Sequence, residues 1–222
     1  MIEGPSWAQL DFAAKTTPEK IRLELMRGVT LYEKFSDLIE TALNYSIGEM
    51  VKAKNIINPA SQKKDRMDED QLTLTLSGPL KGMGFDISHS TNVGGNCDIV
   101  VEGGSEMIWI GEAKIYSDYG KLMGGFQQLC DRYSSGMPNQ NRCGMLIYFF
   151  AGQVAHVMEE WRKYVGDARE HLTSIDVAGN TLQFRTSEPH GATQVALNVL
   201  HMAVPLMHEP TDVAAPPKRG AA

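Results

Sequence analysis

Residues 97–115 read CDIVVEGGSEMIWIGEAKI, and this stretch decides the expected fold. Two runs within it, 97–101 and 106–115, are rich in the β-branched and aromatic residues that favour strands. The run EGGS at residues 102–105 is typical of a turn. The stretch therefore predicts two strands joined as an antiparallel hairpin.

The second run ends with two charged residues, Glu112 and Lys114. Because successive side chains of a strand point to opposite faces, these two share a face with Ile108 and Ile110. Both faces of the run are otherwise largely apolar, which indicates a central, buried strand. Burial of a charged group is costly unless the group is paired or has a function. We therefore expect this strand end to carry chemistry.

Asp98 lies on the preceding run, and the register of the hairpin decides its neighbours. A turn centred on Ser105 sets Asp98 opposite Glu112, and a turn centred one residue earlier sets it opposite Ile110, on the same face. Two close carboxylates repel unless one is protonated or a cation lies between them. Oxygen ligands suit Mg²⁺, with Mn²⁺ as a substitute, and Lys114 would then orient or deprotonate water or stabilise charge on a phosphate. The alternative is a solvated Glu–Lys pair without function.

The region before the hairpin is predicted to be helical. A Thr-Pro-Glu start at residue 17 opens a helix that continues to about residue 57, with candidate breaks at Gly28 and Gly48. Residues 1–16 are expected to be irregular, and residues 59–67 to form a polar loop.

A second helix is predicted to begin at the acidic run Asp68-Glu69-Asp70 and to end at residues 81–84 (KGMG). Its apolar stripe consists of Leu72, Leu76 and Leu80. Glu69 lies on the side of this stripe, which makes it the candidate for a third carboxylate. The alternative is that Glu69 only interacts with the helix dipole, a role that Asp68 and Asp70 fit equally well.

The elements around the hairpin define the fold class. Strands are expected at 85–90, 143–150, 174–177 and 181–186, helices at 119–134 and 154–165, irregular structure at 91–96, a loop at 136–141, and a strand-like segment of uncertain type at 195–206. This order indicates an α/β protein with a mixed central sheet flanked by helices.

We expect a single domain over residues 1–208. It comprises an N-terminal helical region (17–57), a catalytic core (68–150) and a C-terminal extension (151–208), followed by a disordered tail at 209–222. The strands of the extension either widen the sheet or form a surface for a dimer or another partner.

Composition limits the function classes. The chain has 222 residues and a net charge of −6, which disfavours a protein that coats nucleic acid but leaves room for local phosphate contacts. Its three cysteines have no metal-ligand spacing and fit a reducing cytoplasm. No secretory leader and no apolar run of membrane-spanning length are recognisable, so a cytoplasmic protein is expected. The scattered histidines disfavour a zinc site.

Asp98 followed by Glu112-Ala113-Lys114 resembles the signature of the PD-(D/E)xK nuclease superfamily, with Cys97 in place of the usual Pro. The resemblance covers about residues 68–150 and implies a restriction-endonuclease-like core, a mixed central β-sheet flanked by helices. It also implies one or two Mg²⁺ ions held between Asp98, Glu112 and Glu69, with the Ala113 carbonyl as a further ligand.

Members of this superfamily often carry a Gln and a Tyr on the helix after the Lys, a pattern that Gln128 and Tyr133 resemble. The resemblance favours Gln128 as a catalytic residue, whereas a helical wheel sets Gln127 nearer the apolar face. Both assignments remain open from the sequence.

The resulting hypothesis is a Mg²⁺-dependent endonuclease that hydrolyses DNA. A homodimer or higher oligomer would cut both strands of a duplex. The style of the motif resembles effectors of bacterial restriction and anti-phage (antiviral) defence, in which a larger partner could sense the target. The alternatives are a nuclease that acts on RNA, and a non-catalytic binding or assembly subunit on the same fold.

Overall fold

A mixed sheet of seven strands forms the centre of the protein in a computed structural model that describes residues 5–59, 66–89, 91–92 and 94–208. In spatial order its strands are β1 (Asp86–Ser88), β4 (Ile99–Glu102), β5 (Ile108–Ile115), β6 (Arg142–Phe149), β9 (Ala196–Pro205), β8 (Asn180–Pro189) and β7 (Thr173–Val177). The pairs β5–β6 and β6–β9 are parallel, and the other neighbours are antiparallel. The expected α/β class with a mixed central sheet is confirmed.

The β4–β5 hairpin has the first of the two predicted registers. Val100 pairs with Ile110, so the turn is centred on residue 105, and the ladder ends at the pair formed by Ile99 and Gly111. Asp98 was expected within the strand but precedes it, between β4 and the two-residue strand β3 (Asn96–Cys97). As a consequence, β5 runs several residues beyond the end of β4.

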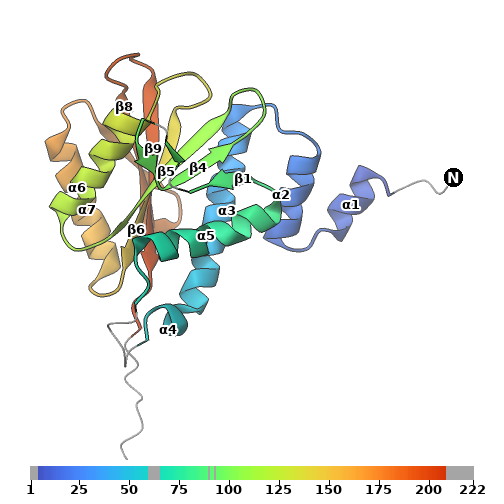
Figure 1. The fold of residues 1–222 in the computed structure, drawn as a ribbon, viewed down its shortest axis with the longest axis horizontal. Helices are drawn as coiled ribbons and strands as arrows, with labels where there is room; N and C mark the ends of the chain where they lie inside the picture. Colours follow the sequence, from blue (N-terminus) through green and yellow to red (C-terminus); the bar gives the residue numbers. More distant parts are fainter. Residues whose placement is uncertain (1–4, 60–65, 90, 93, 209–222) are drawn as a thin grey trace, which may run out of the picture.

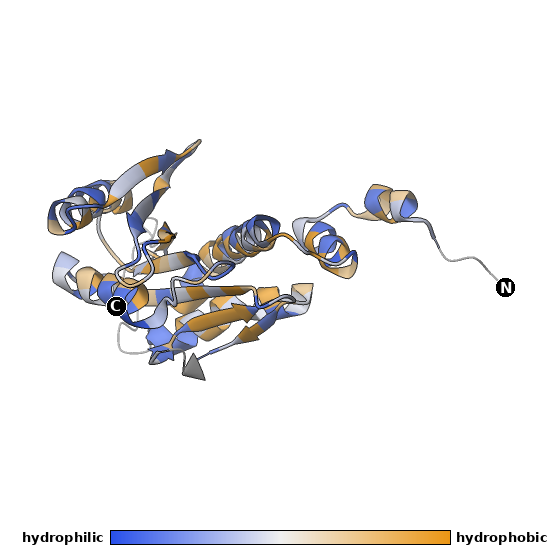
Figure 2. Ribbon diagram, turned by 90° about the horizontal axis from the view of Figure 1, so that it is seen from above, coloured by the Kyte–Doolittle hydropathy of each residue, from blue (hydrophilic) through white to orange (hydrophobic). Residues whose placement is uncertain are grey.

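Helices cover both faces of the sheet (Figure 1). One face carries α2 (Thr17–Met26), α3 (Tyr32–Lys52) and α5 (Glu69–Met83), and the other carries α6 (Tyr119–Gln127), the π-helix η2 (Gln128–Tyr133) and α7 (Val154–Ala168). Two apolar clusters fill the space between the sheet and these layers. The hydrophobic residues accordingly concentrate on the central strands in Figure 2. The alternation of side chains along β5 therefore sends its residues into two different layers.

The helical predictions need three corrections. The irregular start contains α1 (Trp7–Ala13), which begins with a capping box formed by Ser6 and Gln9. It buries no residue and lies away from the sheet (Figure 1). The helix is interrupted at Gly28, as predicted, and the φ of 82° at this residue suits glycine. No interruption occurs at Gly48, which lies inside α3. A second break, which was not predicted, separates α3 from the short α4 (Lys54–Ile57).

Two further segments differ from expectation. Residues 91–97 were expected to be irregular up to 96, but they contain the small antiparallel pair β2 (Thr91–Asn92) and β3. The helix expected at 119–134 changes from α to π geometry at Gln128. The extra residue in a π turn changes which positions face inward, and an α-helical pattern cannot anticipate this.

The C-terminal extension is part of the sheet. The segment of uncertain type is β9, which lies parallel to β6 and antiparallel to β8, and Pro205 is tolerated because it is the last residue of the strand. Residues 209–222 and most of the predicted 59–67 loop lie outside the described residues. No described helix combines the length and apolar composition that a membrane span requires.

Candidate active site

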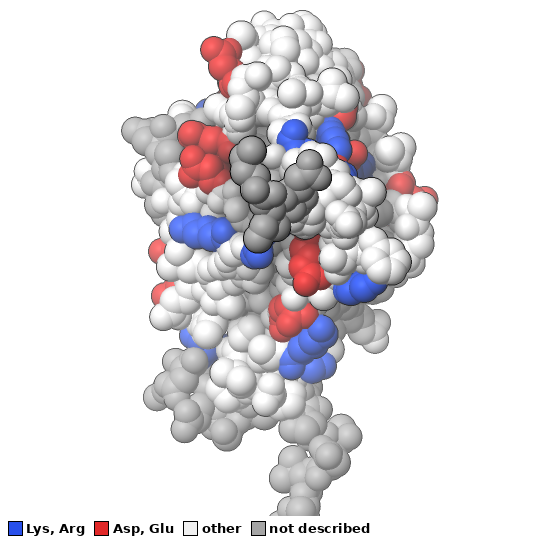
Figure 3. All heavy atoms as spheres, turned by 90° about the vertical axis from the view of Figure 1, so that its right-hand side faces the viewer, with Lys and Arg blue, Asp and Glu red and all other residues white. Residues whose placement is uncertain are grey.

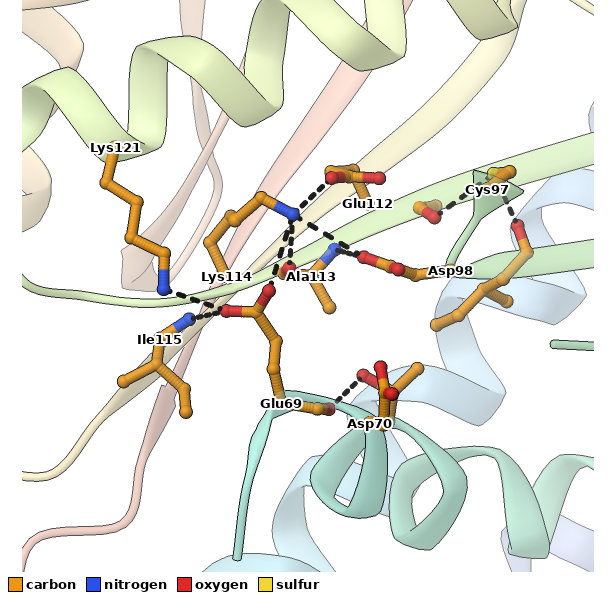
Figure 4. A network of polar contacts seen from close by, with 12 residues as sticks. Glu69, Asp70, Cys97, Asp98, Glu112, Ala113, Lys114, Ile115 and Lys121 are labelled. Atoms are coloured by element: carbon orange, nitrogen blue, oxygen red, sulfur yellow. Dashed lines mark hydrogen bonds and ion pairs between the residues drawn. The ribbon is translucent and has the colours of Figure 1, made fainter. Parts of the chain in front are cut away.

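The site lies where β5 extends past β4. Along this edge, main-chain N–H groups would pair with β4 if that strand continued. Instead, the N–H of Ala113 donates to Asp98 Oδ2 at 2.8 Å, and the N–H of Ile115 donates to Glu69 Oε2 at 2.7 Å (Figure 4). Two carboxylates thus replace the missing strand, one from the chain before β4 and one from the first turn of α5.

The ammonium group of Lys114 lies where the predicted acids meet (Figure 4). It donates a hydrogen bond to Glu112 Oε1 and another to the Ala113 carbonyl at 3.1 Å. It also lies 3.4 Å from Glu69 Oε1 and 3.8 Å from Asp98 Oδ2. The ammonium therefore contacts all four groups that the superfamily resemblance assigns to a metal ion.

Glu112 is the most deeply buried of the three carboxylates, with 1% of the residue exposed. Its Oε2 atom is buried without a hydrogen-bond partner. Burial, and next the charge of Asp98, raise the pKa of Glu112 to about 7, although Lys114 acts in the opposite direction. Burial also raises the pKa of Asp98, against the hydrogen bond from Ala113. A cation close to both carboxylates would favour their ionised forms.

Lys114 remains positively charged in this surrounding. Burial by itself lowers the pKa of Lys114, but the hydrogen bond and charge of Glu112, followed by the charges of Asp98 and Glu69, raise it overall. Gly125 of α6 makes room for this side chain, because a Cβ atom there would lie 2.9 Å from Lys114 Cγ. Sequence reasoning missed Gly125. Its only signal was a Gly-Gly pair inside a predicted helix.

Glu69 is held from several sides. Its main-chain oxygen accepts from Thr73 Oγ1 at 2.8 Å, and the buried hydroxyl of Tyr148 lies 3.3 Å from the same Thr73 oxygen. Lys121 of α6 donates to Glu69 Oε2 at 3.1 Å. Asp68 caps α5 by accepting from the Gln71 main chain. Of the three acids at this helix start, Glu69 alone enters the site, as predicted, whereas Thr73, Tyr148 and Lys121 were not foreseen.

Gln128 is the first residue of η2, which packs against β5. Its side chain is half-buried and that of Gln127 is exposed, so the helical-wheel preference for Gln127 was wrong. Within the described chain, no hydrogen bond joins Gln128 to the other candidate residues. Tyr133, at the far end of η2, is buried, and burial followed by the charge of Glu112 raises its pKa.

The donor set suits a hard divalent cation. It comprises three carboxylates and one main-chain carbonyl, all oxygen ligands, and includes one buried oxygen without a partner. In the described parts of the chain, no three Asp, Glu, His or Cys side chains are already arranged around a metal position. Here the Lys114 ammonium lies among the carboxylates instead.

Tyr116 and Tyr119, which flank the site in sequence, pack against other rings. Tyr116 lies 5.2 Å from Phe149 between ring centroids, and Tyr119 stacks on Tyr164 at 5.6 Å. Both tyrosines therefore have a packing role in the structure.

Comparison of the chain with protein-family models, with curated proteins and with solved structures finds no match.

Proposed function

We propose that the protein is a Mg²⁺-dependent endonuclease that hydrolyses DNA, with a restriction-endonuclease-like core in residues 68–150. The observation that carries the proposal is the environment of Glu112. This carboxylate is almost fully buried, has an unpartnered oxygen, and lies in one cluster with Asp98, Glu69 and Lys114. Such an arrangement is costly for folding and is typical of functional sites.

The residues divide into two roles. Asp98, Glu112, Glu69 and the Ala113 carbonyl would hold Mg²⁺, which in such sites polarises the phosphate and lowers the pKa of a bound water. Lys114 orients the attacking water or stabilises negative charge on the phosphate. The ammonium of Lys114 contacts every one of these oxygen groups, and this places it beside any phosphate or water that they hold.

The order of helices and strands along the chain supports the proposed nuclease core. Within residues 69–149 the order is helix, strands ending in the β4–β5 hairpin, helix, and a strand parallel to β5. This order of elements supports the proposed core, a mixed sheet flanked by helices. On the face shown in Figure 3, Lys and Arg side chains are interspersed with Asp and Glu. Among the described residues, no extended basic surface is visible on that face (Figure 3). We propose that a second copy or a larger partner contributes to target binding.

A non-catalytic assembly subunit is the second candidate, and one observation favours it. Lys114 and Lys121 already pair with the three carboxylates, so the cluster can be read as a structural ion network that needs no metal. The two candidates differ in whether the cluster binds a divalent cation.

The decisive experiment combines calorimetry with a cleavage assay. Mn²⁺ or Mg²⁺ is titrated into the protein at pH 8, and supercoiled plasmid and single-stranded RNA are incubated with protein and Mg²⁺. The test variants are Glu112→Gln and Lys114→Ala. The matched controls are Glu49→Gln and Lys52→Ala, which alter an exposed Glu–Lys pair on α3.

We expect the wild type and both controls to bind the metal and to cut plasmid. Glu112→Gln should lose metal affinity, and Lys114→Ala should lose about 10²-fold or more in cleavage rate, as for removal of a group that manages protons or charge. Cleavage of RNA alone would reassign the substrate. Absence of metal binding at millimolar concentration, together with no cleavage by the wild type, would favour the assembly subunit. Cleavage that Glu112→Gln leaves unchanged would exclude this cluster as the active site, and either result would sink the proposal.

A further inference from the structure

His89 follows directly after β1, at the point where the β1–β4 ladder ends. The last pair of that ladder joins Ser88 to Val100. Two residues before Val100, Asp98 lies between β3 and β4 and belongs to neither strand. Its main-chain oxygen lies 2.6 Å from Nδ1 of His89. Beyond the end of the ladder, the side chain of His89 therefore makes the hydrogen bond to the main chain of Asp98.

The chemistry of this contact fixes the tautomer of the imidazole. A carbonyl oxygen can only accept, so Nδ1 carries the proton and donates it to the Asp98 oxygen. The side chain of His89 is 18% exposed, and its Nε2 atom lies 3.8 Å from Asp70 Oδ1 on the first turn of α5. The ring is thus placed between the Asp98 backbone and the helix that carries Glu69.

We propose that His89 is a positioning residue for Asp98. Asp98 is held at two ends: His89 donates to its main-chain oxygen, and Ala113 donates to its carboxylate Oδ2 at 2.8 Å. Because Asp98 lies outside both flanking strands, the contact from His89 limits rotation of its backbone. The carboxylate thereby stays directed at Ala113 and at the ammonium of Lys114. The relevance of this device to catalysis rests on the proposed nuclease function.

Three substitutions separate the donor role from other roles of the ring. In His89→Asn, the side-chain amide nitrogen occupies the place of Nδ1 along the side chain and can still donate to Asp98. In His89→Gln, the nitrogen lies one atom further out, in the place of Nε2. His89→Ala removes both. A positioning role through Nδ1 predicts that Asn rescues and that Gln does not.

The primary readout is hydrogen exchange of single amides, measured by NMR on the full chain without metal. The Ala113 amide, bonded to Asp98, reports on the proposed device. The Ile115 amide, bonded to Glu69, is the internal control on the same strand edge. We expect exchange at Ala113 to accelerate about five- to tenfold in the Ala and Gln variants, and to stay within about twofold of wild type in the Asn variant. Exchange at Ile115 should not change.

Several outcomes would overturn the proposal. Unchanged exchange at Ala113 in all variants would show that His89 does not hold Asp98. Equal acceleration at Ala113 and Ile115 would indicate general loosening of the sheet, and failure of Asn to rescue would exclude the Nδ1 contact as the cause. The plasmid assay separates this inference from the proposed function. If exchange at Ala113 follows the predicted order of the three variants in a protein that neither binds metal nor cuts plasmid, the positioning role of His89 is supported and the nuclease function is refuted.

Discussion

Substitution of Glu112 by Gln should make the protein more stable at alkaline pH and leave it nearly unchanged at acid pH. In the folded protein the pKa of this carboxyl is about 7, compared with its ordinary value of 4.5. A carboxyl whose pKa is raised by folding favours the folded state only while it is protonated. Its stabilising effect is therefore complete below about pH 4.5 and is lost as the pH rises through 7.

The size of the effect follows from the pKa difference. A change from 4.5 to about 7 corresponds to about 3 kcal/mol in the free energy of unfolding. Solvent screening does not reduce this value much, because Glu112 is 1% exposed. Gln is a neutral group of nearly the same shape, so Glu112→Gln keeps the packing and removes the ionisation. We expect the variant to exceed wild type by up to about 3 kcal/mol at pH 8, with the gap closing towards pH 4.5.

Urea denaturation at fixed pH values between 4.5 and 8.5, without divalent metal, measures this difference. The comparison of the two proteins at each pH isolates Glu112, since every other titrating group is common to both. A control variant, Glu49→Gln, should follow the wild type throughout, because Glu49 is exposed. A variant that is less stable than wild type at pH 8 would refute the reasoning, since it would mean that the ionised carboxylate and Lys114 stabilise the fold.

Three further perturbations test the surroundings of the site and the buried His201 of β9. Gly125→Ala should lower the free energy of unfolding by about 1–3 kcal/mol, because its Cβ would lie 2.9 Å from Lys114 Cγ. Gly124→Ala, whose Cβ would have nothing within 4 Å, should raise it by about 1 kcal/mol. Equal effects of the two variants in urea denaturation would contradict this. Tyr148→Phe should cost about 1 kcal/mol and weaken Mn²⁺ binding in calorimetry, since it removes the hydroxyl that helps to hold the start of α5; unchanged affinity would exclude that link. Burial lowers the pKa of His201 from 6.5 to about 3, so stability should fall by up to about 1.4 kcal/mol per pH unit as the pH drops below 6.5. This slope is measured in the Glu112→Gln background, and a flat profile would rule out a neutral buried imidazole.

The hairpin and its register could be predicted because the determining signals are local. A glycine-rich turn and alternation of apolar residues fix which residues of β4 and β5 face each other, and the observed centre at residue 105 is one of two registers that these signals allow. The start of α5 was predictable for the same reason, since Asp68 caps the helix within four residues. Gly48 misled the prediction because α3 packs along its whole length, which offsets the modest cost of one glycine.

The site itself could be predicted only in part. Alternation along β5 brings Glu112 and Lys114 to one face, but the meeting of Lys114 with Glu69 joins residues 45 positions apart and depends on how α5 packs. The same holds for Tyr148, which reaches the start of α5 through Thr73. Neither contact has a periodic signal in the sequence, because tertiary packing alone creates it.

The late start of β4, at Ile99, explains why the carboxylates gather where they do. If β4 began two residues earlier in the same register, its backbone would pair with Ala113. The Asp98 side chain could then not accept from that N–H. The chain instead enters β4 from the β2–β3 pair, and Gly94 and Gly95 between these two short strands lie against η2. A Cβ atom on Gly94 would lie 2.2 Å from the main-chain oxygen of Arg132, and one on Gly95 would lie 2.7 Å from the ring of Tyr133. Both glycines have positive φ, so close backbone packing and turn geometry demand the same residue type. The contact of this turn with η2 therefore keeps the edge of β5 open, and the open edge is what allows Asp98 and Glu69 to cap it.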